Sequence, residues 1–565
     1  MKYLTLCLTA IVLLFTVGCS RVATEVNDLD GGDGETTESA DAISVSPASA
    51  TIPAEGDTFS TTVSSTDDWT MTGDEEVSWC EPSQESGSNG DVVTFTVKPN
   101  TMTAERDVTY TFWCGDESAE LTITQSAPAG QDDSDPYTIY YTTYHLQPVL
   151  FNSTATFGAN LISNTYTDGT GKMVFDGPVT EIGGRAFENC IDLTSITIPG
   201  SVIEIGDYAF SGCSNLKSVN ISEGVAVIGN GAFKSCSSLT DITIPGSITE
   251  FGWEVFTDCS SLESVNIPEG AAKISARTFW NCSSLKSISI PGSVTEIGQE
   301  AFSSCSNLAD ITIPESVTQI GTNAFYGCSS LTSITIPESV TSIAQSTFSG
   351  CSSLTDITIP EGVAVIGESA FSGCSSLTSI TIPESVTEIA QSTFSGCSSL
   401  TDITIPEGVA VIGGSAFSGC SSLTSITIPE SVTSIAPDTF SGCSSLTSIT
   451  IPESVTDIAP FAFSGCSSLT DITIPEGVAV IGERAFSGCS SLTSITIPES
   501  VTEIAYHAFA GCSGLTTVYC KATTPPGYYT DFGFSCTVYV PKGSESDYMN
   551  SWGWREYKIV GYDFN

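Results

Sequence analysis

The chain has 565 residues, with 65 acidic against 16 basic side chains, and its formal net charge is −49. Such a negative surface repels phosphate backbones and anionic headgroups, which argues against nucleic acid or an anionic membrane surface as the partner. Only 14% of the residues are charged and 40% are hydrophobic, so the chain can bury a core and is not a disordered acidic polymer.

The first residues have the features of an export signal. Lys2 is followed by an apolar run that ends in Thr16-Val17-Gly18-Cys19. This ending resembles the lipobox at which bacterial lipoproteins are cleaved and acylated, although Thr16 replaces the usual Leu. The sequence predicts a signal peptide over residues 1–18 and a lipid on Cys19, with a plain secretory signal as the alternative. No second apolar run is long enough to cross a bilayer.

Two folded parts are predicted after the signal, each preceded by a polar segment. Residues 19–42 are polar and acidic and predict a disordered tether. From 43 to 126, short alternating strands such as Phe59–Val63 are separated by turn-rich stretches, which predicts an Ig-like antiparallel β-sandwich. Residues 127–136 are rich in Asp and predict a linker to the second part.

The small domain also resembles the BACON domain of Bacteroidetes surface proteins. The matching features are Trp69, Trp79, the Asn100–Arg106 segment ahead of a strand, and the closing Thr124-Gln125. The resemblance implies a carbohydrate-binding role or a spacer role. Trp69 and Trp79 are therefore candidates for stacking on a sugar ring, and the alternative is that both belong to the core.

Two cysteines of this domain each come directly after a Trp. Cys80 and Cys114 are compatible with a disulfide in an oxidising compartment and equally with a pair of buried free thiols. Two cysteines alone fix no geometry, so both alternatives stay open.

The second part is an array of repeats. Fifteen cysteines from Cys190 to Cys512 stand at a strict interval of 23 residues, and a similar phrase returns around each. A period in the twenties without insertions indicates a solenoid of stacked coils. We expect the solenoid over residues 178–515, an N-terminal cap over 137–177 and a C-terminal cap over 516–565. The predicted fold class is mainly β.

One repeat shows how each coil is built. Pro383 ends a first strand because it cannot donate to the ladder, and residues 393–397 predict a compact turn. The side chains expected to point inward from the two extended pieces are Leu377, Ile380, Ile382, Val386 and Ile389.

The phrase L-x-x-I-x-I resembles a leucine-rich repeat. The fuller form V-x-x-I-x-x-x-A-F-x-x-C-x-x-L resembles the BspA-type class of bacterial surface proteins, over residues from about 178 to 520. The resemblance implies surface exposure and adhesion to host proteins or other bacteria, and it implies no catalytic activity. The cysteine precedes the strand here, whereas it follows the strand in the commoner pattern, so its role cannot be transferred.

The repeat cysteines have two interpretations. One is a ladder of disulfides or metal sites, and the other is a small apolar side chain that fills a tight corner. In-register stacking holds neighbouring Cβ atoms too far apart for a disulfide, and no histidine accompanies the cysteines, so we expect buried thiols. Cys520 and Cys536 lie off the period, and for them a disulfide and free thiols remain equal alternatives.

Two kinds of surface residue are candidates for binding. A Pro-Glu pair recurs in nine successive coils, as at Glu384, and is either a cation-binding stripe or a solvated turn. The repeats vary most in their N-terminal half. The candidate ligand contacts there are Trp253, Arg277, Trp280 and Tyr326, with Lys217, Lys234 and Lys273 as further departures from the repeat.

The function predicted from these features is binding without catalysis. The chain has two histidines, His145 and His507, far apart along the array, and it lacks phosphate loops and metal-ligand spacings. We therefore predict a non-enzymatic lipoprotein of the outer membrane, exposed at the cell surface, without cofactor or metal, that binds host or bacterial surface proteins through the solenoid. The alternative is an accessory glycan-binding lipoprotein of a polysaccharide-uptake system.

Overall fold

The structure is a computed structural model of the chain. It describes residues 43–52, 56–73, 77, 79–98, 106–115, 117–125, 135–528 and 536–564. The expected signal peptide, the lipidation site Cys19 and the tether lie outside the described residues. Among those described, no helix combines the length and the hydropathy needed to cross a membrane.

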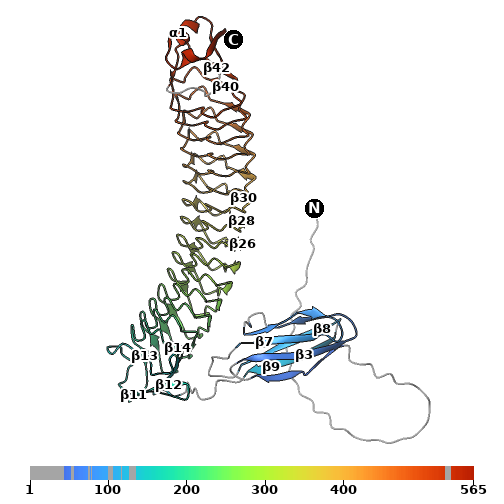
Figure 1. Cartoon of the computed structure of the whole chain (residues 1–565), viewed down its shortest axis with the longest axis vertical. Coiled ribbons are helices and arrows are strands. Elements are labelled where there is room, and N and C mark those ends of the chain that lie inside the picture. The colour runs from blue at the N-terminus through green and yellow to red at the C-terminus, as the bar shows by residue number, and fades with distance from the viewer. Residues whose placement is uncertain are drawn as a thin grey trace, which may run out of the picture.

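The first folded part is a sandwich of two β-sheets (Figure 1). One sheet has the order β1-β3-β7-β5 and the other the order β2-β9-β8-β4-β6. The strands are β1 (Ile43–Ser46), β2 (Ser49–Ile52), β3 (Asp57–Ser65), β4 (Trp69–Thr72), β5 (Cys80–Pro82), β6 (Ser86–Gly87), β7 (Val92–Val97), β8 (Arg106–Cys114) and β9 (Glu117–Gln125). Among the described residues of this part, the strand pairings are antiparallel except that of β2 with β9. The predicted sandwich is confirmed, with one parallel edge pair.

A three-stranded meander closes the first coil of the array. It consists of β10 (Thr138–Thr143), β11 (Leu161–Thr167) and β12 (Thr170–Phe175), and β10 pairs antiparallel with β14 (Leu193–Ile198), the first coil strand of its series. Its side chains Tyr141, Met173 and Phe175 are buried against the first coil. The meander thus covers an apolar end that would otherwise face water.

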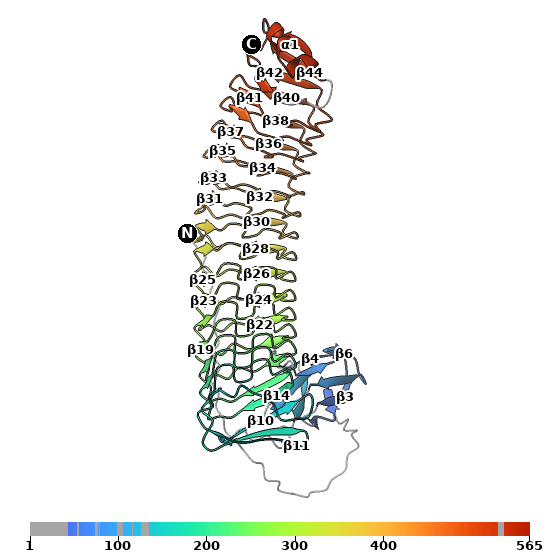
Figure 2. The same cartoon turned by 60° about the vertical axis from the view of Figure 1, so that its left-hand side comes forward.

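The array is a curved rod of coils, each of which contributes strands to two series (Figures 1 and 2). The first series is β14, β16 (Ser218–Ile221), β18 (Asp241–Ile242), β20 (Ser264–Val265), β22 (Ser287–Ser289), β24 (Asp310–Thr312), β26 (Ser333–Thr335), β28 (Asp356–Thr358), β30 (Ser379–Thr381), β32 (Asp402–Thr404), β34 (Ser425–Thr427), β36 (Ser448–Thr450), β38 (Asp471–Thr473), β40 (Ser494–Ile497) and β42 (Thr517–Cys520). Where neighbouring strands of this series pair, they do so in parallel with a 23-residue offset, as between Ile380 and Ile403.

The second series runs along another side of the same coils. It comprises β13 (Glu181–Ile182), β15 (Glu204–Ile205), β17 (Val227–Ile228), β19 (Glu250–Phe251), β21 (Lys273–Ile274), β23 (Glu296–Ile297), β25 (Gln319–Ile320), β27 (Ser342–Ile343), β29 (Val365–Ile366), β31 (Glu388–Ile389), β33 (Val411–Ile412), β35 (Ser434–Ile435), β37 (Asp457–Ile458), β39 (Val480–Ile481), β41 (Glu503–Ile504) and β43 (Gly527–Tyr528). The predicted solenoid is confirmed.

One hydrophobic cluster fills the rod from Ile139 to Trp554. The side chains that the repeat pattern pointed inward, such as Leu377 and Ile389, are fully buried. The phenylalanines from Phe187 to Phe509 form a continuous stack, with ring centroids 5.2–5.7 Å apart and planes within 14° of parallel. Because each coil packs its Phe on the same residue of its neighbour, an insertion within a coil would break the contact on both sides.

The repeat cysteines have a role that the sequence did not reveal. From Cys213 to Cys512, each Sγ donates a hydrogen bond to the carbonyl oxygen of the Phe that lies 26 residues earlier, at 3.0–3.3 Å. These cysteines are buried free thiols, as expected, and the described residues contain no group of three or more side chains able to hold a metal ion. The thiol therefore fills a corner and also adds a second hydrogen bond to a Phe carbonyl that already accepts from a backbone N–H of its own coil.

A compact cap ends the rod at its C-terminus. The strands β44 (Thr537–Pro541) and β45 (Lys558–Tyr562) extend the sheet of β42 in parallel, and between them lie helix α1 (Glu545–Asn550) and a 3-10 turn (Trp554–Glu556). Tyr548 and Trp554 are fully buried, as expected of cap aromatics. Cys520 and Cys536 are both free thiols here, and the Sγ of Cys520 lies 3.1 Å from the Oη of Tyr548.

We predict that the buried thiols resist alkylation until the rod unfolds. Burial raises the pKa of the Cys305 thiol to about 12, so it is neutral and inaccessible at pH 8. Iodoacetamide labelling followed by peptide mass spectrometry should modify Cys213–Cys512 only in denaturant. Labelling of these residues in the native protein at the rate of free cysteine would contradict the ladder.

We also predict that the rod loses stability as the pH rises above about 9. In the unfolded chain a thiol ionises near its ordinary pKa of 9.0, whereas burial raises the pKa to about 12 for Cys259, Cys305 and Cys466. Because the folded pKa is raised, the stabilisation is complete below pH 9 and disappears between pH 9 and 12. Thermal unfolding at pH 7.5, 9 and 10.5 should show this decrease, and a midpoint that stays constant to pH 10.5 would contradict it.

Candidate functional site

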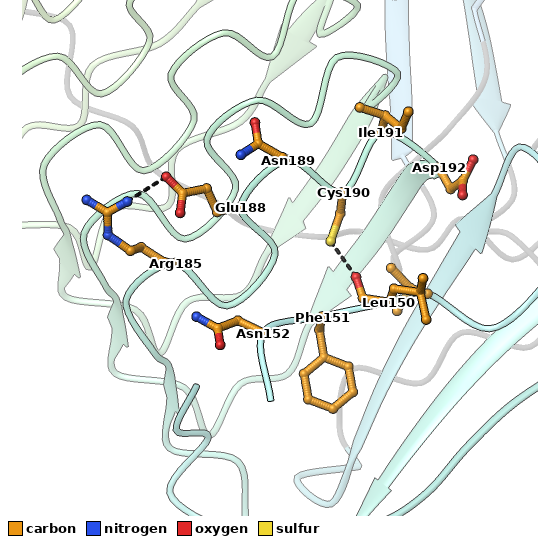
Figure 3. A pocket seen from close by; sticks show the side chains of 10 residues that line it. Leu150, Phe151, Asn152, Arg185, Glu188, Asn189, Cys190, Ile191 and Asp192 are labelled. Atoms are coloured by element: carbon orange, nitrogen blue, oxygen red, sulfur yellow. Dashed lines mark hydrogen bonds and ion pairs between the residues drawn. The ribbon is translucent and has the colours of Figure 1, made fainter. Parts of the chain in front are cut away.

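A pocket of about 470 Å³ lies where the N-terminal cap meets the first coil (Figure 3). Its lining combines apolar and polar side chains. The lining residues are Val149, Leu150, Phe151, Asn152, Arg185, Glu188, Asn189, Cys190, Ile191 and Asp192. Leu150 is 85% exposed and Ile191 is 56% exposed, so large apolar side chains stand at the surface beside this pocket. Exposed apolar groups next to a cavity are typical of a contact surface.

The pocket does not present an activated thiol. Its Cys190 Sγ donates to the carbonyl oxygen of Leu150 at 2.5 Å, and burial raises the pKa of this thiol to about 11. His145 pairs with Asp192, which lies two residues after Cys190 in the chain, and the His145 Nδ1 is 2.5 Å from the Asp192 Oδ1. Because the thiol proton is directed at a backbone carbonyl and is held at neutral pH, this arrangement lacks the thiolate that a Cys-His nucleophile requires.

A row of left-handed residues runs along the rod from the pocket. The residue two positions before each Phe has a positive φ of 52–59° in every coil from Arg185 to His507, and we call these positions the left-handed row. The members are Arg185, Tyr208, Gly231, Glu254, Arg277, Glu300, Asn323, Ser346, Ser369, Ser392, Ser415, Asp438, Phe461, Arg484 and His507. Only one is glycine, although a left-handed backbone is unfavourable for other residues, and for large ones most of all.

The N-terminal part of this row and the neighbouring Trp253 carry a group of aromatic and cationic side chains. The guanidinium of Arg185, which lines the pocket, lies over the ring of Tyr208 at 4.9 Å. The ring of Tyr208 meets that of Trp253 edge to face, with centroids 6.3 Å apart and an interplanar angle of 85°. Trp253 is 45% exposed. We call Arg185, Tyr208, Trp253 and Arg277 the N-terminal cluster.

The single glycine of the row makes room for this cluster. A Cβ on Gly231 would lie 2.5 Å from a carbon of the Tyr208 ring, far inside van der Waals contact. The ring of Tyr208 therefore occupies the space that a side chain at 231 would fill. Gly231 and Tyr208 are matched to each other, which is not expected of side chains that merely drift on a repeat surface.

Ion pairs extend the cluster along the next coils. The carboxylate of Glu254, only 8% exposed, accepts from Lys234 Nζ at 2.5 Å and from Arg277 at 3.3 Å. Arg277 also contacts Glu300 through its Nε at 2.6 Å, and these contacts raise the pKa of the guanidinium. The charged side chains are thus held in place, and Arg277 remains 45% exposed with room for a partner.

The other predicted ligand contacts lie at different places. Trp280 and Tyr326 each follow a Phe of the stack and stand on the same turn side of the coils, Trp280 half-buried and Tyr326 47% exposed. In the sandwich, Trp69 is 1% exposed and its indole N–H donates to the carbonyl of Ser88 at 3.0 Å. Trp69 is therefore a core residue and not a sugar platform, because its ring packs against Phe112.

Trp79 and the two cysteines of the sandwich are also engaged within the domain. Arg106 lies over the Trp79 ring at 4.3 Å, and this covers one face of the indole. Cys80 and Cys114 are buried free thiols, so the structure has the second of the two alternatives that the sequence left open.

The exposed side of the first strand series carries hydroxyl and carboxylate rows. Asp356 and Asp402 alternate with Ser379, so like charges stand two coils apart and repel less. Thr401 Oγ donates to the carbonyl of Thr378 at 3.2 Å, and the same bond recurs along the row, so these hydroxyl protons are already used. The Pro-Glu row, as at Glu384, is exposed, and among the described residues it is not part of any group of three or more His, Cys, Asp or Glu side chains that could hold a metal ion.

Sequence reasoning selected Trp253 and Arg277 but missed Arg185, Tyr208 and Gly231. The signal that could have found them is the alignment of the repeats, in which the middle coils have Ser at this position. Arg185, Tyr208 and Gly231 all depart from that Ser.

The comparisons with known proteins agree with the repeat geometry. The model of the BspA type leucine rich repeat region matches residues 166–286, 272–401 and 387–516. The chain belongs to the BspA-type leucine-rich repeat family. A putative N-terminal binding domain, the BACON domain, matches residues 67–126, so the resemblance of the small domain is also confirmed. No curated protein matches the chain.

Two solved structures of leucine-rich repeat proteins are similar to this chain. A leucine-rich repeat protein of Bacteroides ovatus is 29% identical with a TM-score of 0.52, over 73% of this chain and 98% of that one. A leucine rich cell surface protein of Faecalibacterium prausnitzii is 34% identical with a TM-score of 0.38, over 55% of this chain and 94% of that one.

We predict that Gly231→Ser destabilises the rod by about 1–3 kcal/mol, because a left-handed residue gains a side chain and the Tyr208 ring must move. Tyr208→Ser combined with Gly231→Ser should restore most of the loss, since it removes the collision. Chemical unfolding of the single and double variants measures this coupling. Equal losses in the two variants would show that Gly231 is not matched to Tyr208.

Proposed function

We propose that this protein is a non-enzymatic surface lipoprotein that binds proteins of host or bacterial surfaces through the N-terminal cluster and the adjoining pocket. The observation that carries the proposal is the continuous path from the pocket through Arg185 and Tyr208 to Trp253. Arg, Tyr and Trp are the residues most enriched in the energetic centres of protein interfaces. The name of the Faecalibacterium relative, a cell surface protein, supports the location.

The proposed location combines the sequence with the shape of the rod. Acylation of Cys19 would hold the mature chain at the outer membrane, and residues 20–42 would separate the folded parts from the bilayer. The acidic surface would not bind the membrane directly. The rod would then present its coils to other cells and to host proteins.

A second candidate is glycan binding as an accessory protein of polysaccharide uptake. The observation that favours it is the match of residues 67–126 to a putative binding domain. Burial of Trp69 and the Arg106 contact of Trp79 weigh against a sugar platform on these two rings. The protein-binding proposal is therefore preferred.

The test compares the mature chain with a variant on parallel arrays of extracellular-matrix proteins, bacterial surface proteins and glycans. The variant carries Arg185→Ser, Tyr208→Ser and Trp253→Gln, which are the residues that the middle coils have at the same positions, as at Gln345 and Ser346. We expect protein binding by the wild type and a loss of about tenfold or more in affinity in the variant.

A matched control carries Gln391→Ala and Ser392→Ala in a middle coil and should bind as the wild type does. Thermal unfolding checks that both variants are folded. Unchanged protein binding by the cluster variant would overturn the proposed site, and binding to glycans alone would favour the second candidate.

A further inference from the structure

The left-handed row carries a second group of aromatic and cationic side chains near the other end of the rod. The guanidinium of Arg484 lies over the Phe461 ring at 5.7 Å. One coil on, the rings of Tyr506 and His507 have centroids 3.8 Å apart, and Tyr506 is 51% exposed. Phe461, Arg484 and His507 all have positive φ. We call Phe461, Arg484 and Tyr506 the C-terminal cluster.

The coils between the two clusters offer none of these side chains on the row. The row carries Ser at four successive coils from Ser346 to Ser415. The sequence has no Lys or Arg between Lys286 and Arg484, while acidic residues continue throughout. The middle coils can therefore neither copy the contacts of the ends nor attract an acidic partner.

The middle coils are also a rigid spacer of fixed length. One hydrophobic cluster and one Phe stack run through them without interruption, so the ends cannot approach each other. Phe461 lies eleven coils after Tyr208, which at the 5.2–5.7 Å spacing of the Phe rings is about 60 Å. The 46-residue block Cys328–Gly373, repeated almost exactly as Cys374–Gly419, lies wholly within this spacer.

We propose that the rod is a bivalent binder, in which the N-terminal and C-terminal clusters engage two like surfaces of one repetitive or oligomeric protein about 60 Å apart. This inference rests on the proposed function, to which it adds a second contact surface and the kind of partner. A rigid connection holds the second cluster at high effective concentration only when the partner's two surfaces match its length. The affinity for a protein with a single epitope would not be increased by the second cluster.

The experiment uses the array protein that the wild type binds most tightly, immobilised at low density, with the soluble mature chain as analyte. The C-terminal variant carries Phe461→Ser, Arg484→Ser and Tyr506→Gln, again the residues of the middle coils. We expect its dissociation to be about tenfold faster or more than that of the wild type. The Gln391→Ala and Ser392→Ala variant is the control, and thermal unfolding checks that each variant is folded.

A second variant changes only the spacing. Deletion of Cys328–Gly373 removes two whole coils, about 11 Å of rod, and joins Gly327 to Cys374 in register. Both clusters remain intact, so we expect faster dissociation in this variant through loss of simultaneous binding alone. Deletion of Cys374–Gly419 removes an almost identical block and should behave in the same way.

The outcomes separate this inference from the proposed function. If the N-terminal variant loses binding while the C-terminal variant and the deletions dissociate like the wild type, the bivalent inference is overturned and the proposed function stands. If the N-terminal variant binds unchanged, or the wild type binds no protein of the array, the proposed function fails and the inference fails with it.

Discussion

The exact register between neighbouring coils is the constraint on which the rest of this structure depends. The phenylalanine of a coil meets its own equivalent 23 residues away, and the cysteine reaches into the coil before, as when Cys397 bonds to the carbonyl of Phe371. The carbonyl of Phe371 also accepts from the N–H of Cys374 in its own coil, so the thiol of Cys397 adds a second bond to this oxygen and ties the two coils together. This explains why the period holds without an insertion over the whole array.

The same constraint divides the surface into fixed and free positions. Side chains that face inward have no alternative partners, whereas the left-handed row, half-buried in most coils, holds Ser, Arg, Tyr or Phe at nearly the same φ. A rod with a uniform core can thus carry different chemistry at its two ends and almost none in its middle. Specificity in such a protein depends on where along the rod a departure occurs, more than on the shape of any one coil.

Much of the fold was predictable because its signals are repeated. The spacing of Leu377, Ile380 and Ile389 fixes which side chains are buried, and fifteen coils give the same answer. The left-handed row was not predictable, because the usual sign of a positive φ is glycine and only Gly231 supplies it. The contact between Gly231 and Tyr208 was missed because it joins two neighbouring coils. Neither residue shows, from the sequence of its own coil, that the other one packs against it.

The candidate site was predicted in part. Trp253 and Arg277 stand out by residue type alone. Arg185 belongs to the candidate site only because the N-terminal cap folds against it and forms the pocket. The ligand role of Trp69 failed for a physical reason that sequence cannot resolve. A Trp on an alternating strand can face either side of a sandwich, and here the indole packs on Phe112 in the core.

The cysteine ladder has a consequence for how the protein withstands oxidation. A chain with fifteen thiols at regular intervals would ordinarily cross-link to itself or to its neighbours in air-exposed fluid. Here the thiols from Cys213 to Cys512 are buried in the core and donate hydrogen bonds to carbonyl oxygens. Oxidants therefore do not reach them while the rod stays folded. The rod gains the chemical durability of a disulfide-bonded protein without forming a single cross-link along this ladder, and it needs no redox machinery to sort its pairs.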